Sequence, residues 1–356
     1  MDQWLSMIVL ATGSPRRDQG PGPFDPVCGQ PLVKFAIDAA ADLPVDRIVV
    51  VVGRGSDDAA KRLNELSPQR PIESVEQATA RGSGDAVALA LTALADDLVD
   101  LEESASVLVV PGAAALVRPQ TLTDLVVAHG ATTAAATLLT FTGPDQTGDV
   151  RRDRDGRIVA LDDQETGAET ASGIGVYRRS LLGAAVRRLS PRYSFGESCF
   201  ADVVEVLAEA GHRIGQQHLA DPSEAMAADD HVRLARVESA LRERINLAWL
   251  SSGVTMVDPD HTYIDAPTSI GRGTHILPGC TLAGACHVGA DVRLGPDVHL
   301  TDCAIGDRAA VRSATGTDAE IGPGADVGPY AVLRPGAQIP GELVTGPFYA
   351  ADSSAD

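Results

Sequence analysis

The last third of the chain carries an aliphatic residue at every sixth position, and this period constrains the fold more than any other feature. The step slips by one at Ile305, pauses over 312–320 and returns at Ile321. A period of six matches neither an α-helix nor a strand, so it predicts stacked solenoid coils that bury their apolar positions against one another. The first aliphatic residues of the series are Ile264, Ile270, Ile276, Leu282, Val288, Leu294 and Leu300. Four positions after each of them lies a small residue: Thr268, Thr274, Cys280, Cys286, Val292, Val298 and Ala304.

This repeat resembles the hexapeptide repeat of left-handed parallel β-helices, in which three hexapeptides form one triangular coil. Glycine supports the resemblance, because a corner directly after the aliphatic residue is expected to need positive φ. About four coils fit between Tyr263 and Phe348. The glycines at this position are Gly271, Gly289, Gly295, Gly306, Gly322 and Gly328.

Composition limits the partners and the compartment. A net charge of −20 argues against a nucleic-acid or membrane partner, since both require basic surface. The five cysteines contain no Cys-x-x-Cys pair, so the sequence indicates neither a disulfide framework nor a zinc site. The apolar run Met7–Ala11 is too short for a signal peptide, and no stretch reaches the length of a membrane span. We therefore expect a cytoplasmic protein.

Apolar runs and amphipathic stretches alternate over the first 225 residues. This alternation implies βαβ units and a mostly parallel sheet covered on both faces. Strands are predicted at 7–10, 46–53, 71–75, 105–110, 134–141 and 173–177, helices at 29–40, 56–66, 84–94, 119–129 and 200–209, and a hairpin around Asp155-Gly156.

Apolar residues recur at helical spacing from Leu234 to Ala248, and Gly253 follows as a stop signal. This helix is predicted to link the two domains. The predicted organisation is an α/β domain at 1–225, a linking helix at 226–253, a short solenoid at 254–349 and a disordered tail at 350–356.

An α/β domain, a linking helix and a hexapeptide solenoid, in that order, resemble the bacterial bifunctional N-acetylglucosamine-1-phosphate uridyltransferase/glucosamine-1-phosphate N-acetyltransferase family. The resemblance implies a Rossmann-like nucleotidyltransferase domain, a left-handed parallel β-helix, homotrimers formed through that β-helix, and a place in peptidoglycan precursor synthesis. The agreeing motifs are Leu-Ala-Thr-Gly at 10–13, Gln77 with Gly-Ser-Gly-Asp-Ala at 82–86, Gly-Glu-Ser-Cys-Phe-Ala-Asp at 196–202 and Gly-Val-Thr-Met-Val-Asp-Pro at 253–259.

The resemblance also implies which residues serve the uridyltransferase reaction, in which UTP and a sugar 1-phosphate yield a nucleotide sugar and pyrophosphate. Such a transfer needs backbone N–H groups and cations around the phosphates. Arg17 falls at the loop arginine and is the predicted catalytic residue, and Asp229 falls at a Mg²⁺ position, with Asp230 as the alternative. The implied nucleotide-binding residues are Leu10, Ala11, Thr12, Gly13, Gln77, Gly82 and Ser83, and the implied sugar-binding residues are Gly148, Asp163 and Gly173.

Two charged groups of the family are replaced in this chain. Phe24 stands where the family has a phosphate-binding lysine, and Ala113 where it has a metal-binding aspartate. Loss of one electrostatic stabiliser typically costs about 10²–10³ in rate. Lys34 could substitute for the lysine, although an ordinary solvated lysine is the favoured interpretation. Arg16 and Arg17, together with Asp229, could instead rebuild the phosphate site.

The acetyltransferase half of the family is expected to be missing. Only Arg334 matches a substrate contact, and the family's lysine position falls near Asp352. His275, His287 and His299 are two hexapeptides apart, whereas the same face of successive coils recurs after three. We therefore expect solvated histidines on different faces of the solenoid.

Two hypotheses remain for the function. The favoured one is a catalytically degenerate relative, a pseudoenzyme that binds a uridine nucleotide or nucleotide sugar without a metal. The alternative is an active, monofunctional UTP:N-acetylglucosamine-1-phosphate uridyltransferase that uses Mg²⁺ and a rebuilt phosphate loop.

Overall fold

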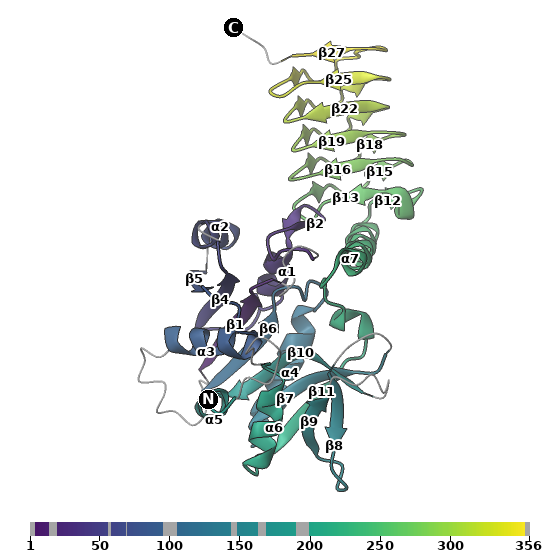
Figure 1. Ribbon diagram of the computed structural model, residues 1–356. Coiled ribbons are helices and arrows are strands. Elements are labelled where there is room, and N and C mark those ends of the chain that lie inside the picture. The colour runs from purple at the N-terminus through teal and green to yellow at the C-terminus, as the bar shows by residue number, and fades with distance from the viewer. Residues whose placement is uncertain are drawn as a thin grey trace. The chain divides into compact units, whose positions relative to one another are not determined.

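Two compact units make up the chain. The computed structural model describes residues 4–13, 20–55, 58–68, 70–94, 105–143, 148–162, 169–189 and 199–352 (Figure 1). The first unit comprises Met1–Asp25 and Pro31–Val237, and the second comprises Pro26–Gln30 and Glu238–Asp356. The border falls inside helix α7 (His231–Ser251). The predicted boundaries differ, because they placed 26–30 in the first domain and treated 226–253 as a separate linker.

The first unit is built on one sheet with the strand order β11-β7-β10-β6-β1-β4-β5. Along this path the pairings are parallel except those of β10, which is antiparallel to both β6 and β7. Strands β8 (Asp149–Arg152) and β9 (Ile158–Asp162) join the same sheet off this path, also in antiparallel pairings. The mostly parallel sheet is therefore as predicted. The strands are β1 (Leu5–Ala11), β4 (Arg47–Gly53), β5 (Ile72–Gln77), β6 (Ser106–Pro111), β7 (Ala136–Phe141), β10 (Thr170–Arg178) and β11 (Ile214–His218).

Both faces of this sheet are buried, which explains the continuous apolar runs of its strands. Successive residues of a strand point to opposite faces. Accordingly Met7 and Val9 of β1 belong to one core cluster, and Ile8, between them, belongs to another. The first cluster also contains residues of α1 (Leu32–Asp38), α2 (Ala59–Leu66) and α4 (Pro119–Gly130). The second contains residues of α3 (Ser83–Ala93), α5 (Arg179–Val186) and α6 (Asp202–Glu209).

The predicted hairpin is formed by β8 (Asp149–Arg152) and β9 (Ile158–Asp162), with Gly156 at φ 77° in its turn. Two elements of the first unit were not predicted. Helix α5 is short and contains Gly183, and strand β11 is polar, with Ile214 as its buried residue. Eight residues with an internal glycine and five largely polar residues are weak sequence signals, so tertiary packing decides their conformation.

The second unit is a parallel β-helix, consistent with the left-handed coil that the resemblance implies. From β12 (Thr255–Met256) onward, its strands pair in parallel within three sheets, and β2 (Pro26–Val27) pairs separately with β3 (Gln30–Pro31). The register joins residues three hexapeptides apart, as in the pairing of Ile264 with Leu282 and of Leu282 with Leu300. The first sheet joins β12 to β15 (His275–Ile276), β18 (Arg293–Leu294), β21 (Ala310–Val311) and β24 (Asp326–Val327). The second joins β13 (Tyr263–Ile264), β16 (Thr281–Ala283), β19 (His299–Thr301), β22 (Ala314–Thr317), β25 (Ala331–Leu333) and β27. The third joins β14 (Ser269–Ile270), β17 (His287–Val288), β20 (Ala304–Ile305), β23 (Glu320–Ile321) and β26 (Gln338–Ile339). Their strands run in chain order from β12 (Thr255–Met256) to β27 (Ala350–Ala351) (Figure 1).

The aliphatic residues of the repeat are buried as predicted, and so are Cys280 and Cys286. The apparent pause over 312–320 is not a break in the solenoid. Strand β22 (Ala314–Thr317) fills it, and Gly316 takes the aliphatic place by pairing with Leu300 and Leu333. At the earlier slip the small slot is filled by Cys303, which is buried, and not by Ala304, which is exposed.

The predicted reason for the corner glycines is wrong at most positions. Gly295 and Gly328 have positive φ, at 98° and 101°. At Gly271, however, φ is not positive, and a Cβ atom would lie 2.5 Å from the backbone of Gly289 in the next coil. A column formed by Gly271, Gly289, Gly306 and Gly322 therefore allows neighbouring coils to approach closely.

The end of the solenoid also differs from the prediction, which gave a disordered tail from residue 350. Ala350 and Ala351 form β27 and pair with Val332 and Leu333 of β25 (Ala331–Leu333). Ala351 is buried in the core cluster of the coils. Pairing satisfies the backbone groups, and two alanines present no side chain too large for the coil. The solenoid therefore continues two residues further than expected.

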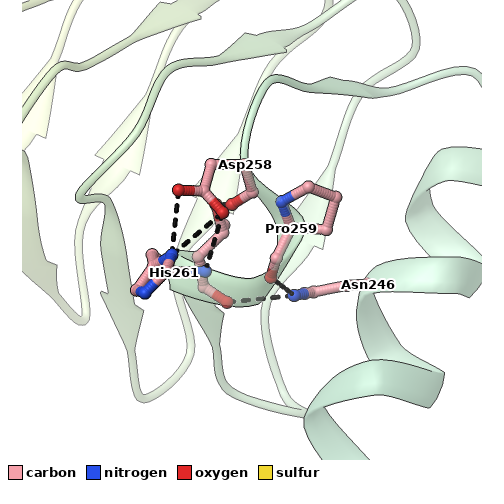
Figure 2. A network of polar contacts seen from close by, with 5 residues as sticks. Asn246, Asp258, Pro259 and His261 are labelled. Atoms are coloured by element: carbon pink, nitrogen blue, oxygen red, sulfur yellow. Dashed lines mark hydrogen bonds and ion pairs between the residues drawn. The ribbon is translucent and has the colours of Figure 1, made fainter.

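Helix α7 is fixed to the first coil by a polar network within the second unit (Figure 2). The Asn246 Nδ2 atom donates to the carbonyl oxygens of Pro259 and Thr262 over 2.8 and 2.9 Å. Asp258 accepts from the backbone N–H of His261 and contacts its Nδ1 atom at 2.9 Å. These contacts hold the turn Pro259–His261 against the last part of α7.

None of the helices in the described residues combines the length and the apolar character that a membrane span needs.

Candidate functional site

A pocket opens at the carboxyl ends of β1 and β6. These strands are parallel neighbours, and the strand order reverses between them, because β4 and β5 continue on the other side of β1. In open α/β sheets, ligands bind at such a switch point. The cavity has a volume of about 350 Å³. Its lining comprises Leu10, Ala11, Gly13, Pro21, Gly22, Pro23, Leu32, Pro111, Gly112, Ala113, Ala228 and Asp229.

Gly112 allows the two strand ends to lie close together. Its N–H donates to the Leu10 carbonyl oxygen over 2.8 Å. A Cβ atom at Gly112 would lie 3.0 Å from that oxygen and 3.1 Å from the Ala11 Cα atom. A larger residue would push β1 and β6 apart at the pocket, so the glycine shapes the wall between them.

The two positions predicted for a metal come together in this pocket. The N–H of Ala228 donates to the Ala113 carbonyl oxygen over 3.3 Å, which places Asp229 beside Ala113. The Asp229 carboxylate forms an ion pair with Arg233 over 3.1 Å. Asp230, the alternative metal ligand, instead accepts from the Arg233 backbone N–H over 2.7 Å and caps the start of α7.

The described pocket residues offer a Mg²⁺ ion a single carboxylate. Mg²⁺ is usually held by one or two carboxylates together with phosphate oxygens. Among the described lining residues only Asp229 offers a carboxylate, and Arg233 already neutralises it. Among all the described residues there is no group of three or more His, Cys, Asp or Glu side chains arranged so that it could hold a metal ion.

The predicted phosphate loop lies partly in the pocket. Leu10, Ala11 and Gly13 line it, and Thr12 lies between them in the chain. Gly13 has φ 77°, which a larger residue adopts only at a steric cost. The predicted catalytic residue, Arg17, lies outside the described residues.

Lys34 does not replace the lysine that the family has at the position of Phe24. The Lys34 ammonium group forms an ion pair with Asp38 over 2.5 Å, one turn along α1. Lys34 is also absent from the described pocket lining. The prediction of an ordinary helix lysine agrees with this arrangement.

Three of the residues predicted to bind the nucleotide, Gln77, Gly82 and Ser83, gather where β5 leads into α3. Gln77 is buried, and its Nε2 atom donates to the Gly82 carbonyl oxygen over 3.0 Å and to the Asp85 carboxylate over 2.9 Å. The Ser83 hydroxyl accepts from the Phe200 backbone N–H over 2.9 Å. Asp85 was not predicted to belong to this group of residues. Its place in the first turn of a predicted helix, where an acidic residue is favoured, was a signal that could have indicated it. None of these residues is among the described lining of the pocket.

The predicted sugar-binding residues are only partly placed. Gly173 lies where the register of β10 shifts, and a Cβ atom there would approach the Pro111 ring to 3.2 Å. Because Pro111 lines the pocket, Gly173 lies directly behind its wall. Gly148 has φ 117° and accepts from the Ala171 N–H over 3.0 Å. Asp163 lies outside the described residues.

Comparison with known proteins decides the family. Residues 7–220 match the model of the MobA-like NTP transferase domain. Over nearly its whole length, the chain is similar to proteins named bifunctional protein GlmU. The relative from Mycolicibacterium vanbaalenii is 33% identical over 94% of this chain and 70% of its own length. The relative from Rhodococcus opacus is 33% identical over 96% of this chain and 71% of its own length. The relative from Mycobacterium tuberculosis is 32% identical over 98% of this chain and 72% of its own length. The chain belongs to the GlmU family.

The GlmU assignment depends on these sequence relatives. One similar solved structure is 4-diphosphocytidyl-2C-methyl-D-erythritol synthase from Anaerococcus prevotii. The superposition includes 67% of this chain and 96% of the synthase chain, with a TM-score of 0.48 and 15% sequence identity. The domain match and the GlmU relatives show that the first unit is nucleotidyltransferase-like.

The solenoid histidines of this GlmU-family chain do not converge. His275, His287 and His299 lie in β15, β17 and β19, which belong to three different sheets, as predicted. The His287 Nδ1 atom lies 2.9 Å from the hydroxyl of Ser269 in the preceding coil. In the last coils, Arg334 forms an exposed ion pair with Asp352 over 2.7 Å.

Proposed function

We propose that this GlmU-family chain binds a uridine nucleotide or a nucleotide sugar at the switch-point pocket and has lost most or all uridyltransferase turnover. One observation carries the proposal. The described lining of the pocket contains a single charged side chain, Asp229, which is paired with Arg233, and Ala113 lines the same pocket without a charge.

The physical argument is electrostatic. In nucleotidyl transfer the protein contributes mainly positioning and the stabilisation of charge on the phosphates. A wall of backbone groups, proline rings and methyl groups provides shape and N–H donors, and these support binding. The pocket has no described cation to stabilise a transition state, so we expect ligand recognition without efficient turnover.

The decisive experiment compares turnover with binding. Pyrophosphate release is measured with UTP, N-acetylglucosamine 1-phosphate and Mg²⁺ for the wild type and for the Phe24→Lys/Ala113→Asp double variant. Nucleotide binding is measured calorimetrically in parallel. We expect binding without pyrophosphate release by the wild type, and measurable release by the double variant.

Two results would change the proposal. Pyrophosphate release by the wild type well above the blank would establish the alternative, an active monofunctional uridyltransferase with a rebuilt phosphate loop containing Arg16 and Arg17. Absence of nucleotide binding would remove the proposal altogether.

A homotrimer formed through the β-helix and a cytoplasmic role beside cell-wall precursor synthesis belong to the same proposal. Light scattering of the full chain tests the trimer.

A further inference from the structure

A guanidinium group lies on the ring of Phe24, the residue that follows the pocket-lining Pro23 in the chain. The Arg62 Cζ atom is 4.3 Å from the centroid of this ring. Its Nη2 atom also donates to the Phe24 carbonyl oxygen over 3.4 Å. Pro23, the residue before Phe24, lines the pocket. Both Arg62 and Phe24 belong to the first unit.

Phe24 is a fixed platform for this cation. The turn around it is closed by the Asp25 N–H, which donates to the Gly22 carbonyl oxygen over 3.1 Å, and by the Gly22 N–H, which donates to the Asp25 carboxylate over 2.8 Å. The ring itself packs against the core cluster on that face of the sheet. A guanidinium group above such a ring is attracted to its electron-rich face.

Three other basic side chains of this unit are engaged with carboxylates, whereas no described carboxylate forms an ion pair with Arg62. Lys34 is paired with Asp38, and Arg233 with Asp229. Lys61, beside Arg62 on α2, lies 3.9 Å from Glu65. Among the described residues, the one polar contact found for the Arg62 side chain is the Phe24 carbonyl oxygen. An arginine has five N–H donors, so most of this guanidinium group remains available to an anion.

We propose that Arg62, positioned by Phe24, binds the phosphate groups of the nucleotide. This inference rests on the proposed function and adds the residue that recognises the phosphates. The planar guanidinium group pairs with phosphate through two parallel hydrogen bonds. Arg62 is not among the described lining residues, so it assists docking of the phosphates rather than the chemical step, which accounts for affinity without turnover.

The test uses a series of ligands that differ only in phosphate number. Dissociation constants for uridine, UMP, UDP and UTP are measured by calorimetry on the full chain, without metal, for the wild type, Arg62→Met and Phe24→Leu. Lys61→Met is the matched control, because it removes the adjacent charge from the same helix. Thermal unfolding of each variant verifies that it is folded.

We expect Arg62→Met to weaken UTP binding about tenfold or more, since a hydrogen bond to a charged group contributes more than about one factor of ten. The loss should decrease from UTP to UMP and vanish for uridine. Phe24→Leu should weaken nucleotide binding with the same ranking of ligands, most for UTP and not at all for uridine. Lys61→Met should leave UTP binding unchanged. Raising the salt concentration should weaken UTP binding less in Arg62→Met than in the wild type.

Other outcomes overturn the inference in distinguishable ways. Unchanged UTP affinity in Arg62→Met would exclude Arg62 as a phosphate contact while leaving the proposed function in place. Equal losses for uridine and UTP would indicate a general disturbance of the pocket and would also reject the inference. A wild type that binds none of the four ligands would reject the proposed function itself, and with it the role of Arg62.

Discussion

The side-chain amide of Gln77 donates to the Asp85 carboxylate over 2.9 Å, at the point where β5 leads into α3. Gln77 is buried, whereas Asp85 lies in the first turn of the helix. Because its amide nitrogen is engaged by Asp85 and by the Gly82 carbonyl oxygen, the orientation of the Gln77 amide is set. Its carbonyl oxygen is then the atom that remains to accept a hydrogen bond.

Asp85→Ala should therefore destabilise the first unit. It leaves a buried amide donor with one partner fewer, which costs about 1–3 kcal/mol. Urea unfolding measures this loss. Asp124→Ala is the control, because the hydrogen bond between Gln120 and Asp124 is exposed and its loss should cost less than about 0.5 kcal/mol. Equal losses in the two variants would show that the contact between Gln77 and Asp85 contributes nothing special.

The glycine column of the solenoid predicts a steric penalty. A Cβ atom at Gly306 would lie 2.5 Å from the Pro323 backbone nitrogen in the next coil. We expect Gly306→Ala to lower the free energy of unfolding by about 3 kcal/mol, at the upper end of overpacking effects. Gly346→Ala separates this from backbone strain, since Gly346 has φ 74° but nothing within 4 Å of its Cβ position. The control should lose only about 1–2 kcal/mol. The reverse order would disprove the close-approach explanation.

His129 should make the first unit sensitive to acid. Burial, reinforced by the nearby Arg178 charge, lowers the pKa of His129 to about 4. Below pH 6.5 the unfolded chain binds a proton that the folded chain refuses, so stability falls between about pH 6.5 and pH 4 by up to about 1.4 kcal/mol per pH unit. Urea unfolding at pH 7 and pH 5 measures the effect. His129→Gln, which cannot titrate, should show a flatter dependence, and an equally steep one would rule His129 out.

The buried thiols should resist alkylation in the folded protein. Burial raises the pKa of Cys28 to about 12 and the pKa values of Cys280 and Cys286 to about 11. Only the thiolate reacts, so iodoacetamide at pH 8 should leave these three residues unmodified, as mass spectrometry would report. The same treatment in urea should modify all of them. Rapid modification without urea would show that the coils open readily.

The repeat predicted the second unit closely because each aliphatic position has only one place to be buried. The hexapeptide step fixed the three sheets and the burial of Ile264, Leu282 and Leu300. It could not identify Gly316 as a member of the series, because a glycine leaves no apolar signal. Nor could it give the reason for Gly271, since the backbone of the next coil is adjacent only after folding.

The site was predictable where the family resemblance assigned residues to it. The segment Leu10–Gly13 and the pair of Ala113 with Asp229 were inferred from family resemblance, and the structure brings them to one pocket. The contact between Arg62 and Phe24 was not foreseen, because 38 residues separate them and their approach depends on the packing of α2. No local pattern in the sequence encodes such a contact.

The short segment Pro26–Gln30 belongs to the second unit, although the chain on either side of it belongs to the first. The Cys28 carbonyl oxygen accepts from the Ala266 N–H over 2.8 Å, and the Cys28 thiol is buried. The chain thus crosses the border between the units three times, at 25/26, 30/31 and 237/238. No single cut or fusion point can separate them cleanly. A fragment beginning in α7 would lack part of its own unit, and exchange of solenoids between relatives would have to transfer two stretches of gene together.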